Sequence, residues 1–498
     1  METNETNNNG LTKGKGSLKQ RFAAMSIWDW IFTVLLTLLY IGLIVWTGNA
    51  WLIIGIPFVF DLYSTRFIPW GFWKRPKPGQ KPSKVLEWVD AVIFALIAVT
   101  LVNIFLFQNY QIPTSSLEKS LLVGDHLCVS KISYGPRMPN TPISMPMVQN
   151  TLPFFNVKSY LDWPYWEYHR LAGTDSVRHG DIVVFNFPAG DTVCVNMSNP
   201  DYYQILMWQG INSMQKTDVS KLNEFSTAWE RNHYLADLGR KRINQPNSTL
   251  SEIAVRPVDK RDCYVKRCVG LPGDTLCVSH NVLSINGKVV HEYPDVQHCY
   301  KVESSIMLPD KFFSQFGISN EDRSQAGRGP VYILPLSKDK AKSISEMQQI
   351  KSVKMMEEEP DSMGLSVYPF SPDYPWSRDN FGPIWIPKRG ATLTLTPENA
   401  LLYERAISAY EGHQLDVRDG KVYVDGQETT EYTFAMDYYF MMGDNRHKSA
   451  DSRYWGFVPE DHIIGRPLFV WLSLDPDKSG FGKIRTDRFF KTDFDRQW

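Results

Sequence analysis

The strongest constraint on the fold is the series of apolar runs before residue 108. The clearest run covers residues 85–107, where only Glu87, Asp90 and Asn103 interrupt the apolar side chains. A helix of this length crosses the hydrocarbon core of a bilayer. An earlier run at residues 28–46 is also long enough to span. The N-terminal part of the chain is therefore expected to fix it in a membrane.

A shorter apolar run at residues 51–63 decides the topology. Basic residues are concentrated before the first run and again between residues 66 and 84. If the middle run spans, both basic groups lie on one side, as the positive-inside rule prefers. We therefore predict a cytoplasmic N-terminus and place everything after Gln108 outside the cytoplasm. The three predicted spans cover about residues 28–46, 50–65 and 86–107.

The chain after the anchor has the pattern of a mainly β protein. Short apolar runs alternate with tight turns, and Asn286-Gly287 is a hairpin signal that Asp419-Gly420 and Asp425-Gly426 repeat. We predict an antiparallel β-sheet domain with inserted lobes. The predicted divisions are a disordered cytoplasmic tail (1–26), a membrane anchor (27–107), a core (108–190, 261–290 and 415–475), two insertions (191–260 and 291–414) and a C-terminal tail (476–498).

Composition excludes several classes of partner and cofactor. The formal net charge of −1 gives no reason to expect nucleic acid. All six cysteines follow the last apolar run, which permits disulfides, but isolated thiols packed as small apolar groups are the simpler interpretation. There is no CxxC pair, no HExxH and no phosphate-loop pattern. We therefore expect no metal and no organic cofactor.

An aromatic cluster after the anchor has two interpretations. It contains Trp163, Tyr165, Trp166 and Tyr168. Such side chains are common where a protein meets the lipid interface. Packing in the domain core is an equally good explanation, so the sequence leaves this point open.

Four stretches point to one catalytic site. Ser116 follows directly on the anchor, and three later stretches are dense in Gly, Asp, Arg and Lys. A serine hydroxyl is a poor nucleophile until a base removes its proton. The only histidines in these stretches are His179 and His447, and GxSxG is absent. The three later stretches are residues 178–188, 264–274 and 443–460.

Lys266 is the better candidate for the base. It lies inside an apolar strand, and burial disfavours the charged form of an amine. To act near neutral pH, its pKa has to fall by roughly two from about 10.4. Its neighbour Arg267 points to the other face of the strand, so we expect Arg267 to form an ion pair instead.

The four stretches, in this order and behind membrane anchors, resemble the type I signal peptidases, the serine–lysine enzymes that remove signal peptides from exported proteins. GDNRHKSADSRYWGFVPE at residues 443–460 is the most specific part, and neither insertion is covered. The resemblance implies that Ser116 is the nucleophile and Lys266 the general base. It also implies supporting roles, namely the oxyanion hole for Thr114, lysine orientation for Ser449, an ion pair for Asp451 with Arg453, and the same buried turn for Asp444.

The same resemblance implies the substrate and the setting. The partners are preproteins that emerge from the secretion machinery, together with the lipid bilayer. The expected location is a bacterial inner membrane, crossed several times, with the catalytic domain on the periplasmic side. The family uses no metal or organic cofactor.

The chain departs from the family pattern at several positions. The nucleophile is usually followed by Met and, two positions later, by Pro-Thr, whereas Leu117, Lys119 and Ser120 stand here. Leucine keeps the volume of methionine, but the loss of proline loosens the turn. The Asp that usually follows Asn-Arg is replaced by His447. These changes bear on activity.

Two alternatives remain open at this stage. SLEK at 116–119, SIN at 284–286 and KSG at 478–480 imitate the SxxK, SxN and KTG motifs of penicillin-binding enzymes. Gly124-Asp125 would, however, end the helix that such a site needs after two turns. The other alternative is a degenerate relative that has lost catalysis and works as a membrane-anchored binding protein.

Overall fold

The computed structural model falls into two compact units, Met1–Asn103 and Ile104–Trp498, which are described separately. Almost all of the predicted cytoplasmic tail lies outside the described residues, as does the extreme C-terminus. The described residues are 22, 25–48, 50–64, 68, 84–155, 157–190, 192–195, 197, 200–246, 248–327, 329–361 and 364–492.

Helices account for most of the described part of the N-terminal unit. Helix α2 (Ile27–Thr47) begins at a capping box in which Ser26 and Asp29 bond each other's backbone N–H groups, so Asp29 is used at a helix end. Helix α4 (Lys84–Phe105) follows the linker. Both helices are long and apolar enough to span a membrane, and their side chains are mostly exposed.

The middle apolar run forms a shorter structure. It folds into η1 (Ala50–Gly55) and α3 (Ile56–Tyr63), and its apolar helical part covers Leu52–Leu62. Two helices of the described residues therefore meet the length needed to span. A full third span stays a prediction.

The core of the C-terminal unit is one antiparallel sheet of seven strands in the order β1-β2-β21-β3-β6-β19-β20. The predicted mainly β, antiparallel class is confirmed. Strand β6 lies near the middle and pairs with β3 and β19, which brings three distant stretches of sequence together. The strands are β1 (Phe107–Gln111), β2 (Asp125–Ser130), β3 (Ile182–Asn186), β6 (Cys263–Gly270), β19 (Tyr438–Met442), β20 (Val458–Pro459) and β21 (Ile463–Ser473).

Smaller sheets flank this core, and the predicted hairpins are among them. Asn286, Asp419 and Asp425 have positive φ values of 53°, 52° and 51°, each before a glycine, as tight two-residue turns require. These turns join β8 to β9, β15 to β16 and β16 to β17. The strands are β7 (Thr275–Ser279), β8 (Val282–Ile285), β9 (Lys288–Val289), β13 (Phe381–Trp385), β14 (Thr392–Thr394), β15 (Leu415–Arg418), β16 (Lys421–Val424), β17 (Gln427–Glu428) and β18 (Glu431–Thr433).

The 191–260 segment is mainly helical. Helices α5 and α7 pack closely, because Gly210 and Gly239 leave no room for a side chain against the facing backbone. The segment contains β4 (Val193–Cys194), α5 (Tyr202–Ser213), α6 (Lys216–Leu222), α7 (Ala228–Ile243) and β5 (Ile253–Ala254).

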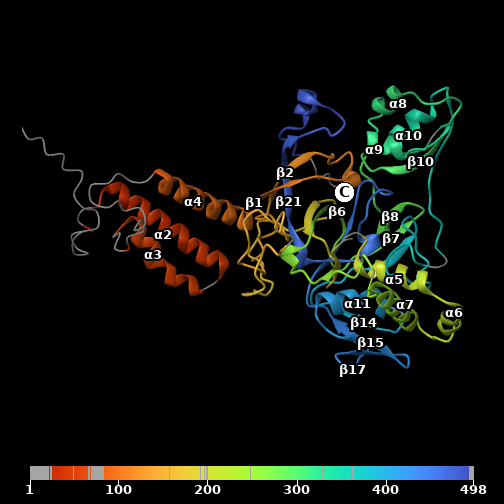
Figure 1. Ribbon diagram of the computed structural model, residues 1–498, viewed down its shortest axis with the longest axis horizontal. Helices are drawn as coiled ribbons and strands as arrows, with labels where there is room; N and C mark the ends of the chain where they lie inside the picture. Colours follow the sequence, from red (N-terminus) through yellow and green to blue (C-terminus); the bar gives the residue numbers. More distant parts are fainter. Residues whose placement is uncertain are drawn as a thin grey trace, which may run out of the picture. The chain divides into compact units, whose positions relative to one another are not determined.

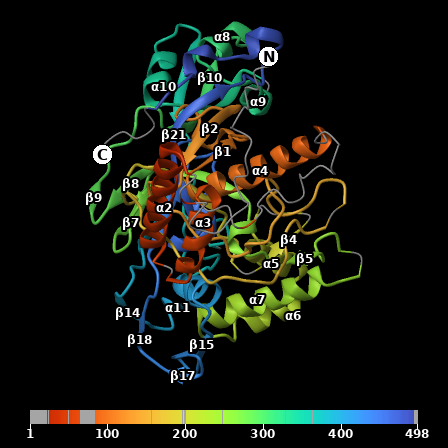
Figure 2. The ribbon, with the colours of Figure 1, turned by 90° about the vertical axis from the view of Figure 1, so that its left-hand side faces the viewer.

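The 291–414 segment begins with a three-stranded sheet that has its own apolar core and is covered by short helices. Figures 1 and 2 show it at one end of the C-terminal unit, while α5, α7 and α11 lie at the other end. The elements are β10 (His298–Ser304), α8 (Asp310–Gln315), α9 (Asn320–Gln325), β11 (Val331–Leu336), α10 (Lys338–Ser345), β12 (Ile350–Met355), α11 (Ala400–Glu404) and the π-helix η5 (Arg405–Tyr410).

Candidate functional site

Ser116 and Lys266 are in direct contact. Ser116 lies in the short helix η3 (Ser115–Leu117), between β1 and β2, and Lys266 lies on β6. The Lys266 Nζ donates a hydrogen bond to Ser116 Oγ at 2.7 Å. Both residues are buried, with exposed fractions of 8% and 3%. A serine and an amine that are 150 positions apart in sequence therefore share one dry site.

The surroundings of Lys266 favour its neutral form. Burial lowers the pKa of Lys266 to about 8, although the negative charges of Asp451 and Asp444 act in the opposite direction. Among the described residues, no carboxylate lies within ion-pair distance of its Nζ, whose other hydrogen bond goes to the Val265 carbonyl at 3.2 Å. A substantial fraction of this amine is thus neutral at mildly alkaline pH.

The turn that follows β19, residues 443–453, contacts the backbone of Ser116. The Asn445 N–H donates to the Ser116 carbonyl at 3.0 Å. Gly443 fits between that carbonyl and Ser449, where any Cβ would clash with both. The Gly443 N–H in turn donates to Asp451 at 3.1 Å. We call residues 443–453 the catalytic turn, because their backbone contacts the backbone of Ser116.

Two buried ion pairs stabilise this turn. Arg453 binds Asp451 through two hydrogen bonds of 2.9 and 2.8 Å, and Arg267 binds Asp444 in the same way at 2.8 and 2.7 Å. Burial acts to raise the pKa of both carboxylates, but their arginine partners hold the pKa of each below its ordinary value. The ion pair predicted for Arg267 is thus confirmed, with Asp444 as its partner. Buried charges of this kind persist only when paired.

Two of the predicted supporting hydroxyls make no bond to the Ser116–Lys266 pair. Ser449 Oγ is buried and has no hydrogen-bond partner of ordinary geometry among the described residues, although it helps to lower the pKa of nearby Asp451. Thr114 is exposed at the start of η3, and its side chain does not cap that helix. The structure therefore groups Ser116, Lys266, Asp444, Asp451 and Arg453, with Thr114 and Ser449 beside them.

Lys119 does not reach Ser116, as an SxxK site would require. Its Nζ donates to the Gly317 carbonyl at 2.7 Å and pairs with Glu118 at 3.2 Å. The contact of Ser116 with Lys266 thus excludes the penicillin-binding arrangement for this serine.

The 291–414 segment supplies contacts to the catalytic turn that the sequence did not indicate. His447 Nδ1 accepts from the Cys299 N–H at 2.8 Å, so its Nε2 carries the proton and donates to Asp379 at 2.8 Å. Lys448 pairs with Asp322 at 2.6 Å. Partners that lie 68 to 148 positions away leave no local pattern in a sequence.

The cysteines of the protein are not joined in disulfides. All six cysteines are free thiols, as the simpler interpretation predicted. Within the described ranges, no group of three or more His, Cys, Asp or Glu side chains is arranged to hold a metal ion.

Comparison with known proteins gives a family for this arrangement. The family described as "Signal peptidase, peptidase S26" matches residues 85–308 and 430–472. The chain is similar to a protein named Signal peptidase I from Haemophilus influenzae, with 23% identity over 410 residues, which are 82% of this chain and 76% of that protein.

Two further relatives carry the same name. Signal peptidase I of Buchnera aphidicola subsp. Baizongia pistaciae is 21% identical over 430 residues, 86% of this chain and 89% of that protein. Signal peptidase I of Buchnera aphidicola subsp. Acyrthosiphon pisum is 56% identical over a short stretch of 41 residues, 8% of this chain and 13% of that protein. The predicted resemblance to the type I signal peptidases is confirmed.

Proposed function

Because the chain belongs to the signal peptidase family S26, we propose that it is a membrane-bound serine endopeptidase with Ser116 as nucleophile and Lys266 as general base. Its substrates are the N-terminal signal peptides of exported preproteins. The observation that carries the proposal is the 2.7 Å contact between Lys266 Nζ and Ser116 Oγ. The lowered pKa of Lys266, about 8, gives the amine the neutral form that a base needs.

In the first step, the neutral Lys266 amine accepts the proton of the Ser116 hydroxyl along their contact. The Ser116 oxygen then attacks the carbonyl carbon of the scissile peptide bond. The negative charge that develops on the carbonyl oxygen is stabilised by the Ser116 N–H and the Thr114 hydroxyl. The exposed position of Thr114 leaves its hydroxyl able to turn toward a bound substrate.

The tetrahedral intermediate then collapses. The Lys266 ammonium gives its proton to the leaving amine, which departs as the new N-terminus of the mature protein. The signal peptide remains as an ester on Ser116. The lysine, neutral again, removes a proton from a water molecule that attacks this ester, and hydrolysis releases the signal peptide and restores the serine.

The remaining predicted residues hold this geometry. We assign orientation of the Lys266 amine to Ser449, which is buried in the same turn. The Asp451–Arg453 and Asp444–Arg267 pairs keep the catalytic turn against the Ser116 backbone. Because both pairs are buried, a loss of either partner leaves an uncompensated charge beside the site.

The proposed setting is a bacterial inner membrane, with several spans and a periplasmic catalytic domain. Candidate spans α2 and α4 support anchoring. The aromatic cluster supports contact with lipid, because Trp163 is 81% exposed and Tyr165 and Trp166 are also exposed. Packing of these three rings in the core, the other interpretation of the sequence, is wrong.

The direct test is cleavage of a preprotein with a small-x-small site by the detergent-solubilised full chain. Wild type and Ser115→Ala are expected to cut at that site, and Ser116→Ala is expected to be inactive. A wild type that binds the preprotein without cleaving it would instead establish the degenerate binding protein. Activity that survives in Ser116→Ala but not in Ser115→Ala would move the nucleophile by one residue.

A further inference from the structure

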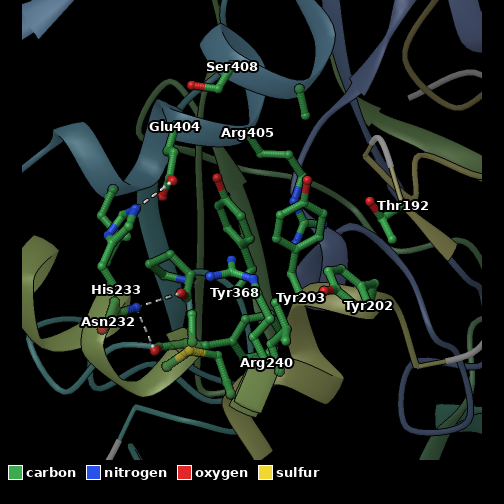
Figure 3. A pocket seen from close by; sticks show the side chains of 17 residues that line it. Thr192, Tyr202, Tyr203, Asn232, His233, Arg240, Tyr368, Glu404, Arg405 and Ser408 are labelled. Carbon is green, nitrogen blue, oxygen red and sulfur yellow. Dashed lines mark hydrogen bonds and ion pairs between the residues drawn. The ribbon is translucent and has the colours of Figure 1, made fainter. Parts of the chain in front are cut away.

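A cavity of about 420 Å³ lies between the 191–260 and 291–414 segments. Every residue that lines it belongs to one of these two segments, and neither Ser116 nor Lys266 is among them. Its walls come from α5, α7, α11, η5 and the Tyr368–Phe370 stretch (Figure 3). We call it the inter-segment cavity. Its volume is in the range of sites that hold small molecules.

The inner walls of the cavity are aromatic and apolar. Tyr203, Tyr368 and Phe370 face it together with Leu206 and Met207. Tyr202 also lines it and meets Tyr203 edge to face, with ring centroids 5.9 Å apart. Rings prefer offset-stacked and edge-to-face partners, so walls of this kind favour an aromatic guest over a polar one.

The charges of the lining are balanced. Arg405 pairs with Asp201 at 2.7 Å, His233 pairs with Glu404 at 3.1 Å, and Arg240 pairs with Asp237. Each cation of the lining therefore already has a carboxylate partner. A charged guest would lose its hydration without gaining an unpaired opposite charge. The cavity thus selects an uncharged guest.

One carboxylate of the lining can accept a hydrogen bond from a guest. The Glu404 side chain is 33% exposed, and Figure 3 shows His233 approaching its carboxylate from one side. The Asn232 Oδ1 has no partner among the described residues, but it is buried away from the open space, and the amide nitrogen of the same side chain donates to the Phe370 carbonyl at 2.9 Å. A guest with a donor group would therefore be bound at Glu404.

The backbone of the cavity wall is unusual in one place. Residues Arg405–Tyr410 form a π-helix directly after α11, and Arg405, Ser408 and Ala409 of this element line the cavity. Short π-helical turns are rare and occur frequently at functional sites. Arg405, the first residue of this element, places its guanidinium carbon 4.3 Å from the ring centroid of Tyr203.

We propose that the inter-segment cavity binds a small, uncharged aromatic molecule that carries a hydrogen-bond donor. The site is separate from the peptidase site and does not depend on the proposed function. The donor of the guest binds the Glu404 carboxylate, and its ring lies between the tyrosine and phenylalanine walls.

The test uses three probes that share one phenol ring, namely p-cresol, which is uncharged, 4-hydroxybenzoate, which is an anion, and tyramine, which is a cation. Saturation-transfer NMR and titration measure their binding to the full chain in lipid nanodiscs, with empty nanodiscs subtracted. We expect p-cresol to bind wild type at least about tenfold more tightly than either charged probe, a difference of about 1.4 kcal/mol.

Two variants of α7 locate the binding. Ala236→Phe fills the cavity, and we expect it to lose p-cresol binding. Leu238→Phe introduces the same ring on the same helix at a residue that does not line the cavity, and it is expected to bind like wild type. The proposal is overturned if wild type does not bind p-cresol, if Ala236→Phe binds it as well as Leu238→Phe does, or if a charged probe binds equally tightly.

Discussion

The catalytic site and the inter-segment cavity both contain buried or half-buried cations, but the pKa values of these cations shift in opposite directions. Lys266 has no carboxylate at ion-pair distance in the described chain, and burial lowers its pKa to about 8. In the cavity, burial also acts to lower the pKa of His233, but the hydrogen bond and charge of Glu404, the Trp229 carbonyl and the charge of Asp237 together raise it. The pKa of Arg405 is raised in the same way by Asp201.

The difference shows what a buried cation needs in order to act as a base. A carboxylate within hydrogen-bond distance keeps a cation charged, so that it can only hold structure or a ligand. A buried amine without such a partner releases its proton near the working pH and becomes able to take one from a nucleophile. The following variants test this contrast, beginning with the largest expected effect.

The largest effect is expected for Lys266→Ala. Loss of a general base costs about 10²–10⁴-fold in rate, and we expect at least this loss in kcat/KM for preprotein cleavage. The matched control is Lys131→Ala, because burial lowers the pKa of Lys131 to about 7 while no described contact joins it to Ser116. Lys131→Ala should retain activity within a few fold. Equal losses in both variants would mean that burial, and not contact with the serine, explains the effect.

The second prediction concerns stability. Asp451→Asn leaves the buried Arg453 without its carboxylate, and the free energy of unfolding should fall by about 3–5 kcal/mol. Denaturant titration of the solubilised protein measures it. Asp162→Asn breaks an exposed pair with Lys158 and should leave the midpoint unchanged. A small effect of Asp451→Asn would show that the turn tolerates an unpaired cation.

The third prediction tests the support that the 291–414 segment gives to the catalytic turn. His447→Phe removes the bonds to Asp379 and to the Cys299 N–H. Because a misplacement of about 1 Å at a catalytic group costs about 10²-fold, we expect kcat to fall by up to about that factor with KM nearly unchanged.

His447→Gln keeps a donor for Asp379 and should recover part of this rate. His280→Phe is the control, because His280 is exposed and also pairs with a carboxylate, Glu357. If His280→Phe loses as much activity as His447→Phe, the contact with the catalytic turn is not the cause. A rise in KM in His447→Phe would point to a role in substrate binding instead.

The fourth prediction is the pH profile of kcat/KM. Protonated Lys266 cannot accept the Ser116 proton, so the rate should rise about tenfold per pH unit below the pKa and level off above about 8. Initial rates from pH 5 to 10 measure the profile in wild type and in Lys131→Ala, which should coincide. A profile that keeps rising to pH 10 would show that Lys266 titrates like an ordinary exposed lysine.

The smallest effect is expected in the cavity. Glu404→Gln removes the carboxylate that pairs with His233 and leaves only the weaker effects of the Trp229 carbonyl and Asp237 to oppose burial, so the pKa of the imidazole should fall. NMR titration of the histidine ring protons measures the change, with His413 as an exposed internal reference. An unchanged pKa would mean that the Trp229 carbonyl, which accepts from the His233 Nδ1–H at 2.9 Å, is sufficient to hold the charge.

Much of the local structure followed from the sequence. The two long apolar runs became α2 and α4, and the Asn-Gly and Asp-Gly pairs became hairpin turns. The middle run was harder, because Gly55-Ile56-Pro57 divides it into a 3-10 turn and an eight-residue helix. Signals of this kind act between residues that are close in the sequence, so the sequence is enough to predict the local structure.

The residues of the candidate site could be predicted from the sequence for a similar reason. Ser116, Lys266 and the catalytic turn lie in short stretches of unusual composition, which also carry the resemblance to the S26 family. Orientation of Lys266 by Ser449, which the resemblance implied, stays a proposal, because Ser449 Oγ has no partner of ordinary geometry in the described chain. The direction of a hydroxyl depends on packing that no motif specifies.

The sequence by itself determined the apolar helices, the antiparallel strands with their turns, and the identity of a serine and a lysine suited to one reaction. Only the tertiary structure decided that, within the described chain, Lys266 has no carboxylate at ion-pair distance, that Asp379 and Cys299 hold His447, and that two distant segments enclose a cavity. The physical reason is the separation along the chain over which each effect acts. Helix and turn preferences act between near neighbours, whereas pKa values and cavities depend on groups that the chain brings together from far apart.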